Sequence, residues 1–413
     1  MGWTRRRSAS WSRLVIPLAL TMLIMDVSMG NAQRRYPIRD CIVLGMSTAL
    51  SGPAAKLGLN MAEGVKAAIE EFNRSGGIHG RNLRLIVLDD GYEPVRTVPN
   101  MRRLVEKERV LAVVGNVGTP TAVVAIPIAN ASRTPFVGAF TGAGILRRKP
   151  PDRYVINYRA SYNEEVTAMV NALMEFARLK PEQIAFFTQR DAYGDAGFAA
   201  GIRALKDHGL HDEHLIVHGR YERNTVAVEN ALAEIIMAEP QPRAVIMVGA
   251  YAPCAAFIML ARNNALNALF LNVSFAGAEP LAKALGPAGD GVIVTEVVPH
   301  YDENLPIAGE YKKALKALNL SGGPSCASLE GYIAMRMLGL ALTSIKGRLT
   351  REAVVDALEA LGEFDLGLGV PLRLGPSQHQ ACHVVWPTML KSGKVVPFEW
   401  KTLAVLGKGK RHD

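Results

Sequence analysis

The sequence lacks the motifs that nucleotide-dependent enzymes, metalloproteases and serine hydrolases require. No Gly-x-Gly-x-x-Gly follows a predicted strand, and no Gly-x-x-x-x-Gly-Lys-Ser/Thr loop occurs. Neither a His-Glu-x-x-His motif nor a Gly-x-Ser-x-Gly nucleophile turn is present. We therefore predict a protein that is not an enzyme, has no catalytic residues, and uses no cofactor or bound metal.

Basic residues are not clustered as they are in nucleic-acid-binding proteins. The formal net charge is +9, but the first 32 residues contribute four arginines and one aspartate to it. No run of Lys and Arg with interleaved aromatics occurs, so we predict no nucleic-acid partner. The remaining basic excess fits either an anionic small ligand, an acidic partner, or an ordinary surface.

The one long apolar stretch is too short to span a membrane. Arginines precede residues 14–25, and small residues at Gly30 and Ala32 follow them. A membrane helix needs about 20 apolar residues, whereas this order is typical of an export signal. We predict a signal peptide over 1–32, cleaved near Ala32, and a periplasmic protein. The alternative is an uncleaved N-terminal anchor.

Cysteine and histidine each leave two interpretations. The cysteines form no Cys-x-x-Cys pair or zinc spacing, so they could make one or two disulfides or stay as buried thiols. They are Cys41, Cys254, Cys326 and Cys382. The clustered histidines could form a metal patch, but their spacing fits no single helix face and favours a solvated loop. They are His208, His211, His214 and His218.

The rest of the chain alternates short β-rich runs with amphipathic helices. Residues 42–46 and 83–88 are predicted strands, and apolar residues at helical spacing predict a helix over 60–73 between them. The same alternation restarts near 154–158, and a β-rich tail covers 384–390 and 395–399. Repeated βαβ units imply an α/β fold with two doubly wound parallel-sheet lobes, to which the last segments return.

Two loops at the predicted carboxyl edge of the first sheet are candidates for binding. Thr119 suits a helix N-cap, Pro120 suits the first helical position, and Gly118 lets a ligand approach the backbone. The next strand leads into a second loop of small and hydroxyl residues, 138–143. Free N–H groups at a helix start could bind a carboxylate, although a plain capped helix would look the same.

Five short stretches, in order, give a family resemblance. They are Leu50-Ser51-Gly52-Pro53, 73–80, 88–90, 113–116 and 191–197. Together they resemble the periplasmic substrate-binding proteins of branched-chain amino-acid ABC transporters, the leucine/isoleucine/valine-binding type of the type I periplasmic binding fold. The resemblance covers nearly all of the chain after the signal.

The resemblance implies two lobes joined by a three-strand hinge. Lobe 1 would comprise 38–158 with 298–366 returning to it. Lobe 2 would comprise 159–297 with 367–405 returning to it, and 406–413 would be a flexible basic tail.

The resemblance also implies the positions that would contact a ligand. The residue that takes the ligand carboxylate falls at Thr119 beside Gly118, and two cleft tyrosines fall at Tyr193 and Tyr251. The second loop supplies Ala139, Phe140 and Thr141. Tyr193 could instead pack on Phe198, and Tyr251 could simply cover the helix that starts at Pro253.

The chain departs from the amino-acid binders at two places. Ser274 stands where those proteins have a glutamate for the ligand ammonium, and Glu279 is shifted from that position. Gly118 and Tyr92 stand where they have a disulfide. An unpaired ammonium is costly to bury, so we expect a carboxylate without an ammonium, or an amide or urea-like ligand, to bind better.

The sequence therefore favours a monomeric periplasmic receptor. It would bind a small amino-acid-like, organic-acid or amide ligand and deliver it to the membrane permease of an ABC transporter. The alternative is a ligand-sensing module that reports to a regulator or kinase. An exported α/β hydrolase is disfavoured because no nucleophile–base signature is present.

Overall fold

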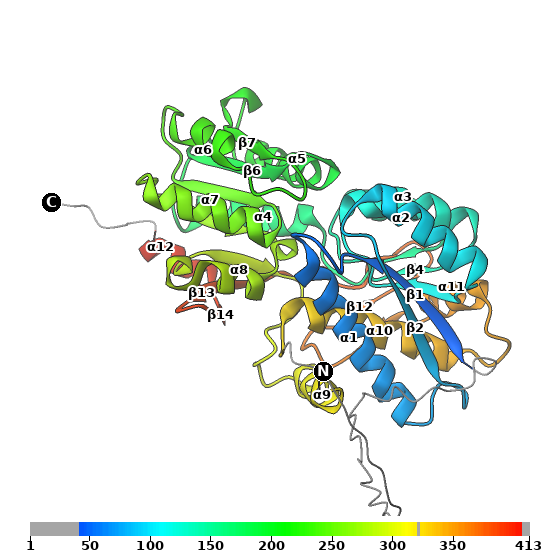
Figure 1. The fold of residues 1–413 in the computed structure, drawn as a ribbon. Coiled ribbons are helices and arrows are strands. Elements are labelled where there is room, and N and C mark those ends of the chain that lie inside the picture. The colour runs from blue at the N-terminus through cyan, green and yellow to red at the C-terminus, as the bar shows by residue number, and fades with distance from the viewer. Residues whose placement is uncertain (1–40, 320–322, 407–413) are drawn as a thin grey trace, which may run out of the picture. The chain divides into compact units, whose positions relative to one another are not determined.

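The computed structural model describes residues 41–319 and 323–406 (Figure 1). The predicted signal peptide, its cleavage near Ala32, and residues 407–413 of the predicted basic tail lie outside the described residues. No helix in the described part of the chain combines the length and the apolarity that crossing a bilayer would need.

The first sheet is parallel and has the strand order β2-β1-β3-β4-β5. Its strands are β1 (Ile42–Thr48), β2 (Leu83–Asp89), β3 (Ala112–Val114), β4 (Phe136–Val137) and β5 (Val155–Ile156). The helices between them are α1 (Ala55–Arg74), α2 (Pro94–Arg102) and α3 (Thr119–Ala131). A π-helical turn, Arg103–Lys107, continues α2.

The second sheet repeats this order and adds an antiparallel edge. Its strands run β14-β13-β10-β9-β8-β6-β7, with β13 and β14 antiparallel. They are β6 (Ile184–Gln189), β7 (His218–Tyr221), β8 (Ala244–Val248), β9 (Leu269–Asn272), β10 (Ile293–Glu296), β13 (Trp386–Lys391) and β14 (Lys394–Pro397). The two sheets confirm the predicted fold class, with two doubly wound parallel α/β lobes.

One set of helices belongs to the second sheet, and the later helices α9 (Pro306–Ala317) and α10 (Cys326–Ser344) pack against α1 of the first lobe. Helix α4 (Tyr162–Glu175) leads from β5 of the first sheet to β6, and the helices that link the strands of the second sheet are α5 (Ala192–Asp207), α6 (Glu229–Ile236), α7 (Tyr251–Asn263) and α8 (Ala278–Leu285). The other later elements are α11 (Arg351–Glu359), the β11–β12 pair (Glu363–Phe364, Leu372–Arg373) and α12 (Leu403–Leu406). Short 3-10 turns cover Gly144–Leu146, Pro181–Gln183, Glu213–Leu215, Ser274–Ala276, Gly286–Gly289 and Trp400–Thr402.

Three chain segments lie side by side where the chain passes between the lobes. The Asn157 amide donates to the His379 carbonyl at 2.7 Å, and the Cys382 amide donates to the Tyr158 carbonyl at 2.8 Å. The Tyr158 hydroxyl donates to the Val297 carbonyl at 3.0 Å. These contacts fit a three-segment hinge, while the lobe boundaries at 158, 297 and 366 stay predictions.

The structure shows the surroundings of the cysteines and of His218 from the histidine cluster. All four cysteines are buried, and Cys254, Cys326 and Cys382 are free thiols. His218 bonds to the Thr188 hydroxyl at 2.7 Å and stacks on Phe198, and burial lowers its pKa to about 4. No cluster of three potential metal ligands occurs among the described residues. His218 is therefore a packed side chain, and the solvated-loop interpretation is wrong for this residue.

Candidate functional site

The start of α3 differs by one residue from the prediction. Gly118 is the N-cap, with φ +105°, and Thr119 is the first helical residue, so the predicted cap at Thr119 is wrong. This φ favours glycine, and an added Cβ would lie 2.2 Å from Cε2 of Tyr92. The Tyr92 ring thus lies against Gly118, at the two positions where the amino-acid binders have a disulfide.

The two predicted binding loops lie against each other. The Thr119 and Thr141 hydroxyls hydrogen-bond at 2.7 Å, and both side chains are buried. The Phe140 amide donates to the Asn116 carbonyl at 2.7 Å, and the Gly118 amide donates to the Phe140 carbonyl at 3.2 Å. Ala139, between these contacts, is also buried. The structure therefore joins both loops, including the predicted residues 118, 119 and 139–141, at the carboxyl edge of the first sheet.

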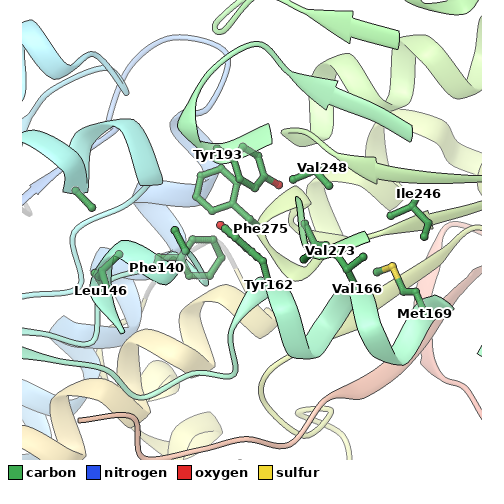
Figure 2. Close-up of a cluster of buried hydrophobic side chains, with 14 of the residues drawn as sticks. Phe140, Leu146, Tyr162, Val166, Met169, Tyr193, Ile246, Val248, Val273 and Phe275 are labelled. Atoms are coloured by element: carbon green, nitrogen blue, oxygen red, sulfur yellow. The ribbon is translucent and has the colours of Figure 1, made fainter. Parts of the chain in front are cut away.

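Aromatic rings from both lobes meet beside these loops (Figure 2). The Phe275 ring lies 4.6 Å from Tyr193, 5.4 Å from Phe140 and 5.7 Å from Tyr92, measured between centroids. Tyr162 packs on Tyr193 at 5.2 Å. Tyr193 therefore does not serve as a partner of Phe198, which stacks on His218 instead. These rings form a closed apolar patch between the loops of the first lobe and those of the second.

Ser274 lies in a buried polar cluster next to this patch. Its amide and hydroxyl both donate to the Glu165 carboxylate, at 2.7 Å and 3.0 Å, and Nη2 of Arg159 donates to its hydroxyl. The Thr295 hydroxyl also donates to Glu165, at 2.7 Å. The Arg159 guanidinium lies 4.8 Å above the Phe140 ring. Ser274 is therefore held between an arginine and a glutamate that are almost wholly shielded from solvent.

Tyr251, the last of the predicted ligand-binding residues, and two nearby carboxylates, those of Glu279 and Asp191, contact other parts of the protein. Tyr251, half-buried at the start of α7, lies next to the Lys56 backbone. Glu279 accepts from the Cys326 amide at 2.9 Å. Asp191 caps α5 through the Tyr193 amide at 3.0 Å and pairs with Arg223 at 3.1 Å. Both carboxylates are thus engaged in structural contacts.

Polar contacts also join the two lobes near the aromatic patch. Arg223 pairs with Glu93 at 2.8 Å, and Asn224 donates to the same carboxylate at 2.6 Å. Gln189 donates to the Tyr92 hydroxyl at 3.1 Å. A small hollow next to these polar contacts is lined by Pro53, Tyr92, Gln189, Tyr221, Asn224 and Pro253, among others. The lobes are therefore in contact around the candidate site.

A second hollow lies away from this site. It is lined by Cys41, Arg109, Arg348 and Arg351, among others, at the amino-terminal edge of the first sheet. Ligands of open α/β sheets bind at the carboxyl edge, so we place the site between the lobes.

Burial raises the pKa of several groups in the site. Desolvation raises the pKa of the Glu330 carboxyl to about 7, although Arg159 opposes this shift. Desolvation likewise raises the pKa of Glu165 and Glu296. It also raises the pKa of the Tyr193 hydroxyl well above its ordinary value, which keeps that group neutral. Burial therefore favours the protonated form of these carboxyls, while the positive charge of Arg159 opposes that effect.

The sequence did not identify several residues of this site. Arg159 directly follows the predicted crossing strand 154–158, and an arginine next to a buried strand is the one sequence feature that could have indicated a role in the site. Phe275 is adjacent to the predicted Ser274, yet a single phenylalanine is more often ordinary core. Tyr162 and Glu165 begin a helix whose face toward the site is set by tertiary packing. Glu330 comes from α10, far along the chain.

Comparisons with known proteins agree with this architecture. A family model described as periplasmic binding protein matches residues 42–394. A curated Brucella abortus protein, Leu/Ile/Val-binding protein homolog 7, is 24% identical over 357 residues, 81% of this chain and 85% of that protein. A solved structure, titled a possible leucine/isoleucine/valine-binding protein from Rhodopirellula baltica SH 1, is 51% identical. It has a TM-score of 0.86 and covers 89% of this chain and 99% of its own.

A second solved structure is similar at lower identity. It is a substrate-binding periplasmic protein from Ralstonia solanacearum, 26% identical, with a TM-score of 0.79, and it covers 86% of this chain and 100% of its own. The family match spans most of the sequence, and the similar structures span nearly all of the described residues. The chain therefore belongs to the periplasmic binding protein family.

Proposed function

We propose that this protein is the solute receptor of an ABC uptake transporter, exported to the periplasm and cleaved near Ala32. The receptor binds a small organic acid or amide between its lobes and delivers it to the membrane permease. The observation that carries this proposal is the Thr119–Thr141 hydroxyl pair at the start of α3, next to an aromatic patch built from both lobes. Hydroxyls and free N–H groups at a helix start bind a carboxylate, and the rings cover an apolar body.

The mechanism that we propose is closure around the hinge. A ligand that contacts both lobes favours the closed state over the open one, and the permease recognises the closed state. Thr119, Thr141 and Phe140 would contact the ligand from the first lobe, with Gly118 and Ala139 allowing close approach. Tyr193, Tyr251 and Ser274 would contact it from the second lobe.

The contacts of Ser274 make a free amino acid an unfavourable ligand. Ser274 carries no charge, its nearest carboxylate already accepts four hydrogen bonds, and a guanidinium lies against it. An ammonium placed there would be desolvated without a counter-ion, and next to a positive charge. The similarity to proteins named for leucine, isoleucine and valine favours the opposite preference.

The test of the proposed function compares leucine with 4-methylpentanoate, the same skeleton without its amino group. We expect the acid to bind at least about tenfold more tightly, because the ammonium lacks a partner. Thermal shift gives the screen, and calorimetric titration of protein purified from the periplasm gives the affinities. Tighter binding of leucine would return the chain to the amino-acid binders. No shift with acids, amides or amino acids would contradict a receptor for this class of solute.

Thr119→Val should weaken binding of the acid by roughly 10- to 100-fold, since a hydrogen bond to a charged ligand contributes about 1.5–3 kcal/mol. Stability should fall by only about 1 kcal/mol, because Thr119 does not cap α3 and loses one hydroxyl contact. Titration and urea unfolding measure the two effects. The control is Thr134→Val, which removes a similar hydroxyl pair with Ser132 just before β4, at the other edge of the sheet. Equal affinity losses in both variants would remove Thr119 from the site.

A further inference from the structure

Arg159 is a buried cation whose hydrogen-bonding capacity is largely unused. Its side chain is 1% exposed, and Nη2 donates to Ser274 and, at 3.4 Å, to Glu165. Within the described residues, Nε and Nη1 have no hydrogen-bond partner. Buried polar groups in folded proteins are almost always satisfied, so unused donors on a buried guanidinium call for a ligand or another acceptor.

The neighbouring carboxylates do not satisfy Arg159 well. Charge-assisted N–H···O bonds are normally about 2.7–2.9 Å long. Glu165 Oε1 lies 3.4 Å from Nη2, and Glu330 Oε1 lies 3.7 Å from Nε. The Glu165 oxygens already accept bonds from Ser274 and Thr295. Neither glutamate makes the two-bond pairing for which a guanidinium is shaped.

Arg159 also lies at the candidate ligand site. Its guanidinium covers the Phe140 ring of the first-lobe loop and bonds to Ser274 of the second lobe. The family resemblance places an ammonium-binding glutamate at the position of Ser274, whereas here that side chain is uncharged and Arg159 donates to it. The Thr119–Thr141 pair, next to Phe140 in the chain, forms a separate anion-binding position.

We propose that the receptor takes a short dicarboxylic acid, with one carboxylate at Thr119 and Thr141 and the second at Arg159. This inference rests on the proposed function and names the class of ligand for that site. Phe140, Phe275 and Tyr193 pack against the apolar middle of the ligand. Glu165 positions Arg159 and Ser274, and burial raises the pKa of Glu330 to about 7, which lowers the negative charge of that carboxyl near neutral pH.

The test measures affinities of matched acid pairs by calorimetric titration of the full periplasmic protein. The pairs are succinate with butanoate, glutarate with pentanoate, and terephthalate with benzoate. At least one diacid should bind about tenfold or more tightly than its monoacid, the usual gain from a charged hydrogen-bonded contact. L-Glutamate, which adds an ammonium to glutarate, should bind more weakly than glutarate.

Arg159→Met should remove the preference for the diacid, because it removes the group that binds the second carboxylate. Arg159→Lys keeps the charge without the guanidinium fork and should retain part of the preference. Arg336→Met, which removes an arginine of α10 that pairs with Glu71 of α1 and Glu310 of α9, should leave the preference unchanged. If Arg159→Met does not fold, the affinities of the wild-type protein and of Arg159→Lys for the matched acid pairs still test the proposal.

The outcomes separate this inference from the proposed function. Monoacid binding without any preference for a diacid overturns the second anion site and leaves the receptor intact. A preference that persists in Arg159→Met also overturns it. Failure of every acid to bind overturns both the inference and the proposed organic-acid receptor.

Discussion

Gly64→Val is expected to unfold the first lobe or to cost more than about 3 kcal/mol of stability. Gly64 is in α1, and a Cβ added there would lie 1.7 Å from the Ser328 carbonyl oxygen in α10. Overpacking against flexible side chains typically costs about 1–3 kcal/mol, but here the obstacle is backbone, so the two helices must separate. A Cβ added at Gly331 of α10 would lie 2.3 Å from the Met61 carbonyl oxygen, so the contact is tight from both sides.

The measurement is urea unfolding followed by circular dichroism, with soluble yield as a first indicator. Gly309→Val is the matched control, because Gly309 lies in α9 and nothing is within 4 Å of an added Cβ. Its stability should change by less than about 0.5 kcal/mol, since valine and glycine differ little in helix propensity. A Gly64→Val protein as stable as this control would show that α1 and α10 do not pack as closely as described.

The fold was predictable where local pattern and tertiary environment agree. The helix over 60–73 was predicted from its apolar spacing, and Met61, Val65 and Ile69 are indeed buried on α1. The strand predicted over 42–46 forms the first part of β1, where the residues are apolar or glycine and mostly buried. Helix α8 was missed because it has only eight residues and directly follows the Ser274–Ala276 turn.

The candidate site was predictable only in part, because it depends on contacts between distant segments. Thr119 and Thr141 each follow a recognisable strand, and parallel topology brings those strand ends together. Arg159, Glu165 and Glu330 meet although no local pattern relates them. The one-residue error at the start of α3 has a local cause. Gly118 adopts a φ of +105°, so the helix begins after the glycine and the Thr119 hydroxyl turns to Thr141 instead of capping.

Glu330→Gln is expected to make the protein more stable at pH 8 and to change its stability little at pH 5. Burial raises the pKa of Glu330 to about 7, from an ordinary value of 4.5. The folded state therefore holds a proton that the unfolded state releases above pH 4.5. Its stabilising contribution is present below pH 4.5 and is lost as the pH rises through 7, a total on the order of 3 kcal/mol.

Glutamine mimics the protonated carboxyl at every pH, so this loss disappears in the variant. Charged or titratable groups facing Glu330 include Arg159, Arg147, Glu165 and Glu296, and all of them remain. The wild type should still lose some stability at higher pH, because burial also raises the pKa of Glu165. Urea unfolding at pH 5 and pH 8 measures the difference, with Glu234→Gln, exposed on α6, as the control. If the free energy of unfolding of Glu330→Gln depends on pH as that of the wild type does, Glu330 is already ionised at pH 5 and paired with Arg159. That pairing would leave the Arg159 guanidinium less able to bind a ligand.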